Sequence, residues 1–283
     1  MRVKDLNKSL AFYQKIMGLK IERRGRDPME DLEIVELGFE ETLIDALHPL
    51  LILKHDPSTK ETAHNFAGLF HFAILVPDRK SLAHAYSALE RNHLRFEGFA
   101  DHLVSESLYL HDPERNGIEI YRDRPISEWT RDRDGHIVMD TLPLDLDGVL
   151  NELSSEERNS PKTFPNGAKI GHMHLRVTNL EQSVRFYREK LGLHVSADWS
   201  RMGAMFLAAG NYHHHIGLNV WYSLNGKKHE RGDAGLDKFM IRLPRDSGVA
   251  SLGSESVKSP SKRNENEELL SDPDGIQLSV GTA

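Results

Sequence analysis

The sequence contains Val177-Thr-Asn-Leu-Glu-Gln-Ser-Val-Arg-Phe-Tyr187, which repeats Val3-Lys-Asp-Leu-Asn-Lys-Ser-Leu-Ala-Phe-Tyr13 from the start of the chain. Each copy leads to a Gly-Leu pair at the same spacing, Gly18-Leu19 in the first and Gly192-Leu193 in the second. An internal repeat of this kind indicates a fold assembled from copies of one structural unit.

Two shorter matches extend the repeat to four units. Leu69-Phe-His-Phe-Ala-Ile-Leu-Val-Pro77 matches Leu236-Asp-Lys-Phe-Met-Ile-Arg-Leu-Pro244. Further along, Asp112-Pro through Gly-Ile-Glu119 matches Asp272-Pro through Gly-Ile-Gln277. The chain therefore contains four related units in the order 1, 2, linker, 3, 4.

Each unit is predicted to form a strand, a helix and then further strands. In unit 3, apolar and polar residues alternate over 172–177, which is typical of a half-buried strand. Thr178 or Asn179 then supplies an N-cap, and Gly192 suits the end of the helix. Unit 2 follows the same plan, with strands near 70–76, 104–110 and 117–122 and a helix near 79–92.

Three segments depart from the repeat. Residues 126–167 form a polar linker with one short helix expected near 145–153. Residues 253–268 are almost wholly polar and are expected to form a mobile loop in unit 4. Unit 1 has only two residues before Val3, so its opening strand is almost missing; a truncated start and a shortened edge strand both account for this.

Composition limits the class of protein. A chain of 283 residues holds two ordinary domains, and we place a first module at 1–125 and a second at 168–283. The net charge of −7 argues against a nucleic-acid partner, and no apolar stretch is long enough to span a bilayer. Without a signal-peptide pattern, we expect a cytoplasmic protein. Because the chain has no cysteine, a metal must be held by His, Asp or Glu.

The strand of unit 2 carries His71, its last strand carries Glu119, and the first strand of unit 3 carries His172. Two neutral imidazoles and one carboxylate are the ligand set of a facial-triad iron(II) site, which leaves positions open for substrate and oxygen. Alternation along the strands puts His71 opposite Phe70 and Phe72, and Glu119 opposite Ile118 and Ile120. We therefore expect the ligands to point into a cup and the apolar residues to pack on helices.

Five segments carry a resemblance to a known family over nearly the whole chain outside the linker and the polar loop. They are 68–78, 101–109, 112–121, 171–177 and 212–221. The chain resembles the vicinal oxygen chelate superfamily of glyoxalases, bleomycin-resistance proteins and extradiol dioxygenases, and more narrowly its two-module bacterial catechol-2,3-dioxygenase-like proteins. The resemblance implies an α+β fold of four βαβββ units, in which paired units form two modules with curved mixed sheets around a cup.

The resemblance also implies a division of the metal ligands between units. In the ring-cleaving relatives one unit gives a His from its first strand, and its partner gives a His from its first strand and a Glu from its last. His172 matches the first role, and His71 and Glu119 match the second. Unit 4 instead has Lys238 and Gln277, and lysine is a poor ligand because its nitrogen must first lose a proton. Unit 2 is therefore expected to pair with unit 3, and unit 1 with unit 4. His174 lies on the same strand face as His172 and is the alternative to it as a metal ligand.

The same resemblance suggests catalytic residues. The relatives carry an acid–base histidine where this chain has His213-His214-His215. Alternation favours His215, with His214 as the alternative because a one-residue slip would exchange them. Tyr109 matches a tyrosine that bonds a substrate oxygen, although it also suits the edge of the core, and His102 is a weaker candidate at the cavity mouth.

These residues predict a metal-dependent extradiol dioxygenase that uses dioxygen to cleave a small aromatic diol. Fe(2+) is the expected cofactor, with Mn(2+) as the alternative, because both accept this ligand set. A glyoxalase-like lyase or isomerase is a competing function, but it commonly needs a second metal carboxylate. A metal-free protein that sequesters a small aromatic is the third. The sequence leaves the oligomeric state open, and a homo-oligomer is compatible with it.

Overall fold

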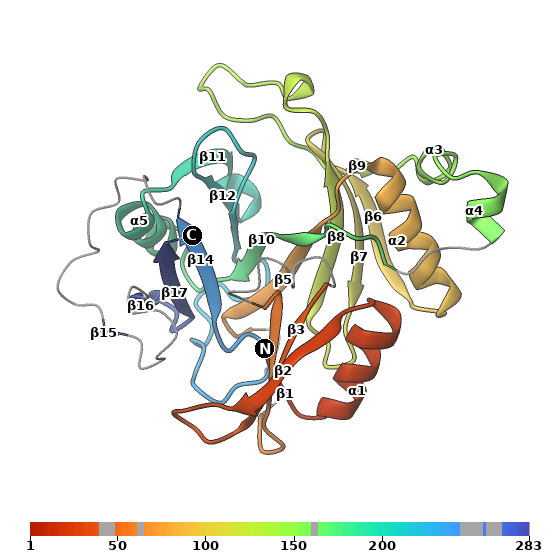
Figure 1. Cartoon of the computed structure of the whole chain (residues 1–283). Coiled ribbons are helices and arrows are strands. Elements are labelled where there is room, and N and C mark those ends of the chain that lie inside the picture. The colour runs from red at the N-terminus through yellow and green to blue at the C-terminus, as the bar shows by residue number, and fades with distance from the viewer. Residues whose placement is uncertain (40–48, 61–64, 160–163, 244–256, 259–267, 283) are drawn as a thin grey trace.

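The computed structural model describes residues 1–39, 49–60, 65–159, 164–243, 257–258 and 268–282. Within this part of the chain, each of the four units contributes four strands in the same spatial order: first, fourth, third, second. In each unit the first and fourth strands are parallel and the other neighbours antiparallel. This common topology confirms the predicted α+β fold of four related units (Figure 1).

The units have the following elements. Unit 1 contains β1 (Arg2–Val3), α1 (Leu6–Leu10), the π-helix η1 (Ala11–Ile16), β2 (Lys20–Arg26), β3 (Glu33–Gly38) and β4 (Leu51–His55). Unit 2 contains β5 (Gly68–Leu75), α2 (Arg79–Arg91), β6 (Phe96–Asp101), β7 (Ser105–His111) and β8 (Gly117–Asp123). Unit 3 contains β10 (Lys169–Arg176), α5 (Leu180–Leu191), β11 (His194–Trp199), η4 (Ser200–Met202), β12 (Ala204–Ala208) and β13 (Ile216–Asn219). Unit 4 contains β14 (Phe239–Leu243), β15 (Val257–Lys258), β16 (Glu268–Ser271) and β17 (Gln277–Thr282).

The linker contains η3 (Ile126–Glu128), β9 (Leu142–Pro143), α3 (Leu146–Leu150) and α4 (Ser155–Asn159). α3 confirms the helix expected near 145–153, and β9 extends the sheet beyond β6. Most of the polar segment 253–268 lies outside the described residues. No helix in the described ranges is long and apolar enough to cross a bilayer. The module boundaries at 125 and 168 stay a prediction.

Capping side chains fix where three helices begin. Asp5, Asp78 and Asn179 each accept a hydrogen bond from the backbone N–H three residues later. Such a bond satisfies one of the donors that a helix start leaves unpaired. α5 ends at Gly192, whose φ of 67° suits a residue without a Cβ atom. The helix positions expected from the repeat are therefore confirmed in units 1, 2 and 3.

Units 2 and 3 share one nine-stranded sheet, in the order β11-β12-β13-β10-β5-β8-β7-β6-β9. The antiparallel pair β5–β10 joins them, with Lys169 opposite Leu75 and Arg176 opposite Gly68. This arrangement confirms that unit 2 pairs with unit 3. Figure 1 shows α2 along one side of β6–β8, and the buried Ile118 and Ile120 belong to the apolar core on the face opposite Glu119.

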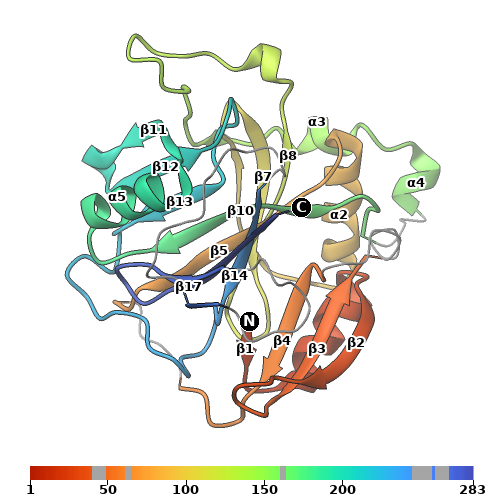
Figure 2. The same cartoon turned by 60° about the vertical axis from the view of Figure 1, so that its left-hand side comes forward.

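Units 1 and 4 each form a separate four-stranded sheet. Figure 2 shows β2, β3 and β4 as a sheet of their own, apart from β5 and β10. The backbone of Arg2 pairs with that of Gly235 in an antiparallel bridge, so unit 1 meets unit 4 just ahead of β14. This contact agrees with the expected pairing of these two units.

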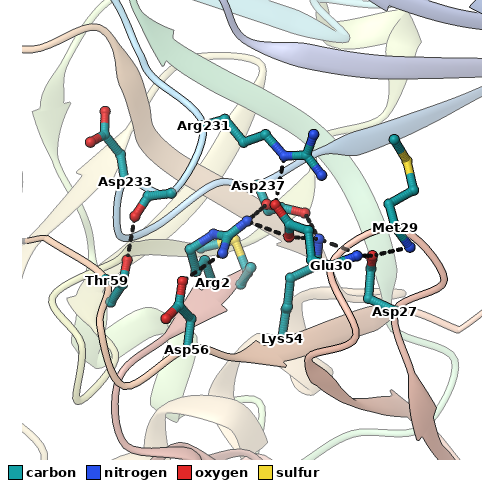
Figure 3. Close-up of polar contacts among 12 residues, drawn as sticks. Arg2, Asp27, Met29, Glu30, Lys54, Asp56, Thr59, Arg231, Asp233 and Asp237 are labelled. Atoms are coloured by element: carbon teal, nitrogen blue, oxygen red, sulfur yellow. Dashed lines mark hydrogen bonds and ion pairs between the residues drawn. The ribbon is translucent and has the colours of Figure 1, made fainter.

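A cluster of ion pairs holds the contact between units 1 and 4 (Figure 3). Arg2 is 2% exposed, and its guanidinium contacts Asp56 at 2.7 Å, Glu30 at 2.7 Å and Asp237 at 2.9 Å. Lys54 lies 2.8 Å from Asp237 and 2.9 Å from Glu30. A buried charge is tolerated when it is paired and hydrogen-bonded, and each cation here has at least two carboxylate partners.

The helical segments of units 1 and 3 each carry a buried tyrosine that hydrogen-bonds a turn of the following unit. The Tyr13 hydroxyl donates to Oδ2 of Asp112 at 2.8 Å, so unit 1 is fastened to unit 2. The Tyr187 hydroxyl donates to Oδ2 of Asp272 at 3.1 Å, which fastens unit 3 to unit 4 in the same way. The matched residues of the sequence repeat therefore make matched contacts in the structure.

We expect Tyr13→Phe and Tyr187→Phe each to lower the free energy of unfolding by about 1–3 kcal/mol, because each leaves a buried carboxylate with one donor fewer. Urea denaturation followed by circular dichroism measures this loss. Tyr86→Phe is the matched control, since the Tyr86 hydroxyl donates to Glu90 at the surface and its loss should cost less than about 0.5 kcal/mol. Equal losses in all three variants would contradict the proposed fastening role.

Candidate metal centre

Three strands of the long sheet bring His71, Glu119 and His172 together. β5 carries His71, β8 carries Glu119 and β10 carries His172, and β5 lies between the other two strands. Oε2 of Glu119 lies 2.9 Å from Nε2 of His71 and 3.0 Å from Nε2 of His172. The possible ligand atoms all lie within 4.8 Å of one another, and all three side chains are buried. The structure thus gathers residues that are distant in sequence.

His172 and Glu119 have the protonation states that metal ligands need. Burial lowers the pKa of His172 to about 4, so its imidazole is neutral near pH 7. Burial alone would raise the pKa of Glu119, but the neighbouring His172 and His71 outweigh it and hold that pKa well below its ordinary value. Ser107 donates to the other carboxylate oxygen, Oε1, at 2.7 Å and so fixes the orientation of Glu119.

The cluster also has a donor atom that the protein leaves unsatisfied. Nε2 of His71 has no aligned hydrogen-bond partner, although it lies 2.9 Å from the carboxylate. A buried polar atom without a partner is costly, unless it serves a ligand. Two imidazole nitrogens converging on one carboxylate oxygen fit a divalent cation with a facial set of two His and one carboxylate.

His174, the rival ligand, lies beside the cluster rather than within it. Its ring centre is 4.9 Å from that of His71, and its Nε2 is also buried without a hydrogen-bond partner. Its nitrogens do not join the compact group formed by the other three side chains. Burial lowers the pKa of His174 well below its ordinary value, so this ring is neutral and forms part of the wall.

A cavity of about 200 Å³ opens above the cluster. Its walls are largely aromatic and apolar, with a few polar side chains among them. They are Phe70, His71, His102, Val104, Ser105, Tyr109, Glu119, Met139, Thr141, His174, Trp199, Phe206, His214 and Trp221. This combination of an apolar wall and a small number of polar groups is typical of a site for a small organic molecule.

Tyr109 and His102 lie together in this wall. The Tyr109 hydroxyl is 2.7 Å from Nε2 of His102, whose Nδ1 lies 2.7 Å from the backbone oxygen of Asp140 in the linker. Burial and the nearby Glu119 raise the pKa of Tyr109 well above its ordinary value, so the phenol keeps its proton. Both residues suggested by the sequence therefore face the cavity.

The expected orientation of the histidine run 213–215 is wrong. His215 is exposed, and its Nδ1 accepts from the backbone N–H of Ala209 outside the cavity. His214 is buried, lines the cavity and packs its ring 4.1 Å from that of His172. β13 begins only at Ile216, so these three residues precede the strand and do not follow its alternation. The alternative residue, His214, occupies the place expected for His215.

The prediction for Phe70 is also wrong: the sequence placed it on the face opposite His71, whereas the structure places it in the cavity wall. The pairing of β5 with β10 shifts register between His174 and Leu175, which face His71 and Leu69, so Phe70 is the extra residue of a β-bulge. A bulge redirects a side chain from its expected face. Phe70 consequently joins the cavity wall, with its ring 5.2 Å from that of Trp221.

Several lining residues carried no signal in the sequence. Met139 and Thr141 come from the linker, which folds back over the cup. Ser107, which donates to Glu119, does not line the cavity. It lies two residues before Tyr109 on β7, so the alternation that places Tyr109 on the cavity face could have identified it. The linker residues belong to no repeat, so no register could have placed them.

Comparisons with known proteins agree with this geometry. The model of the glyoxalase/bleomycin resistance protein/dioxygenase superfamily matches residues 1–120 and 169–280. The chain is 40% identical over 243 residues to the catechol-2,3-dioxygenase of Bacillus subtilis (strain 168), a match that covers 86% of this chain and 80% of that protein.

Two solved structures show the same fold at low sequence identity. Glyoxalase I from Zea mays has a TM-score of 0.55 and 18% identity, over 99% of this chain and 89% of the other. The cppA protein from Streptococcus pneumoniae TIGR4 has a TM-score of 0.54 and 12% identity, over 100% of this chain and 96% of the other. By its family match and its curated relative, the chain belongs to the glyoxalase/bleomycin resistance protein/dioxygenase superfamily.

Proposed function

We propose that this protein is a metal-dependent extradiol ring-cleaving dioxygenase that acts on a small catecholic aromatic. The convergence of His71 Nε2 and His172 Nε2 on Glu119 Oε2, at the floor of an aromatic-walled cavity, carries this proposal. The 40% identity to the catechol-2,3-dioxygenase of Bacillus subtilis supports it independently.

His71, His172 and Glu119 would hold the metal, and Fe(II) is the ion we propose, with Mn(II) as the alternative. When bound there, the ion supplies positive charge and open positions at which a catechol and dioxygen meet. Ser107 keeps one carboxylate oxygen of Glu119 engaged, so the other oxygen remains directed at the two imidazoles.

The remaining polar groups of the cavity wall would hydrogen-bond the substrate and exchange protons with it. Nδ1 of His102 donates to the backbone oxygen of Asp140, so Nε2 of a neutral His102 accepts from the Tyr109 hydroxyl. Tyr109 keeps its proton, and its oxygen would accept a hydrogen bond from a substrate hydroxyl. His214 would exchange a proton with the ring-opening substrate. The ring contact between His214 and His172 supports a proton exchange next to the proposed metal ligands.

The size and charge of the cavity narrow the substrate class. A cavity of about 200 Å³ accommodates a single substituted ring, and its rings from Phe70, Trp199 and Phe206 suit an aromatic molecule. No Lys or Arg occurs among the described residues that line it. We therefore propose an uncharged, single-ring catechol as the substrate, since a carboxylate on the ring would be buried without a partner.

A glyoxalase-like lyase fits the cavity less well. Such a reaction commonly uses a second carboxylate at the metal, and Glu119 is the only carboxylate among the described lining residues. A metal-free binding protein would leave unexplained why Nε2 of His71, at the floor of the cavity, has no aligned hydrogen-bond partner.

We expect about one iron per chain after anaerobic Fe(II) loading, because the three residues form a single site. His71→Ala, His172→Ala and Glu119→Ala should each lose the metal and the oxygen uptake on catechol. Elemental analysis and an oxygen electrode measure the two quantities. His174→Ala is the control, since it removes a buried neighbouring imidazole that stands outside the ligand group, and it should retain the iron. Metal retained in the His71 or Glu119 variant would refute the site.

The charge of the cavity predicts a strong discrimination between ring substituents. We expect kcat/KM to be at least about 100-fold lower for 3,4-dihydroxybenzoate than for 3,4-dihydroxybenzamide, equivalent to about 2.8 kcal/mol. The amide has nearly the same shape without the charge, so it controls for size. Equal turnover of the two compounds would show that the ring substituent does not enter the described cavity.

A further inference from the structure

We propose that Asp123 and His213 form a positioning pair that fixes the tautomer of His214, so that Nε2 of His214 faces the cavity without a proton. The proposal deepens the proposed function, because it explains how His214 is ready to accept a proton from a catechol. Neither His213 nor Asp123 lines the cavity, so both act through His214.

A continuous chain of hydrogen bonds links His214 to His213 and then to Asp123, and it leads away from the cavity. Nδ1 of His214 lies 2.7 Å from Nδ1 of His213, and Nε2 of His213 lies 2.9 Å from Oδ1 of Asp123. His213 is fully buried, and Trp129 of the linker covers it with a ring distance of 5.3 Å. With its Nδ1 engaged by His213, His214 has only Nε2 left to serve the cavity.

The hydrogen-bond donors and acceptors available on Asp123 and His213 then determine the tautomer of His214. An ionised carboxylate only accepts hydrogen bonds, so Nε2 of His213 must carry a proton and donate to Asp123. A neutral imidazole has a single N–H, so Nδ1 of His213 is an acceptor and Nδ1 of His214 must be the donor. The proton of His214 is therefore on Nδ1, and Nε2 presents a lone pair.

A contact to the other carboxylate oxygen of Asp123, Oδ2, holds this side chain in place. The Tyr212 hydroxyl donates to Oδ2 of Asp123 at 3.0 Å, and the Tyr121 hydroxyl lies 2.8 Å from that of Tyr212. Because the hydrogen of Tyr212 is used on the carboxylate, Tyr121 donates to Tyr212. Burial and the nearby Asp123 raise the pKa of Tyr212 well above its ordinary value, so Tyr212 remains a donor.

The position of Asp123 follows from the strand that carries the metal ligand. Asp123 lies four residues after Glu119 on β8, and Tyr121 lies between them, so all three belong to one face of the strand. One strand face thereby supplies both a metal ligand and the acceptor that ends the histidine chain. A buried carboxylate that holds an imidazole in one tautomer acts in the same way in hydrolase triads, where its amide replacement preserves the geometry and lowers kcat.

Asp123→Asn tests the pair in the iron-loaded enzyme, because an amide has nearly the shape of the carboxylate but can donate. We expect kcat on catechol to fall by about 100-fold, the lower end of what general acid–base catalysis contributes, with KM and iron content unchanged. Glu97→Gln is the matched control: Glu97 contacts Nδ1 of His111 at 2.6 Å on the same sheet, outside the cavity, and its loss should leave kcat unchanged. An unchanged kcat in Asp123→Asn, or a loss of iron, would overturn the proposal.

A second measurement does not depend on activity. In the metal-free protein, ¹⁵N–¹H correlation spectra of the imidazoles should show His214 with its proton on Nδ1, and Asp123→Asn should move that proton toward Nε2. An Nε2-protonated His214 in the unaltered protein would refute the pair, because it would require His213 to be an imidazolium that donates from both nitrogens. The expected tautomer without oxygen uptake on any catechol would instead contradict the proposed function and leave the pair intact.

Discussion

The antiparallel pairing of β5 with β10 is the interaction on which the site depends. Unit 2 holds two of the metal-ligand candidates and unit 3 holds the third, so neither unit is complete alone. In this register Ala73 lies opposite His172 on one side and opposite Glu119 on the other. Ala73 is fully buried and small, which leaves the space above it for the carboxylate and the imidazole. A larger side chain in the middle of this row would fill the place where the two groups meet.

Close packing behind the ligands supports the same arrangement. A Cβ atom on Gly171 would lie 1.9 Å from the Tyr121 hydroxyl, so only glycine fits beside His172 in this position. A Cβ atom on Gly217 would lie 2.9 Å from the ring of His174. These glycines allow the strands to carry large rings on adjacent positions, and the rings fix one another. Preorganisation of this kind holds catalytic groups in place before the substrate arrives.

The sequence predicted the fold and the proximity of His71, Glu119 and His172 because both depend on the repeat. Alternation along regular strands placed His71, Glu119 and Tyr109 on the cavity face, and the lysine at 238 excluded unit 4 as their partner. The same reasoning failed at His215 and Phe70, where the backbone departs from a regular strand: one lies ahead of β13 and the other in a bulge. Met139 and Thr141 could not be found, since the linker has no counterpart elsewhere in the chain. Periodicity predicts contacts within regular strands, and it carries no information where the backbone is irregular.

The two pairs of units share one topology but differ in their polar side chains. In units 2 and 3 the inward groups are imidazoles and one carboxylate, and Nε2 of His71 has no aligned hydrogen-bond partner. In units 1 and 4 the ion-pair cluster of Figure 3 sets Arg2 and Lys54 against surrounding carboxylates, while Lys238 is exposed. A carboxylate whose oxygens already accept from a guanidinium or an ammonium has little left to offer a cation, and a nearby positive charge repels one. The ion pairs therefore stabilise the contact between units 1 and 4 and at the same time make it unsuited to a metal, whereas the candidate metal ligands His71, Glu119 and His172 lie in the cup of units 2 and 3.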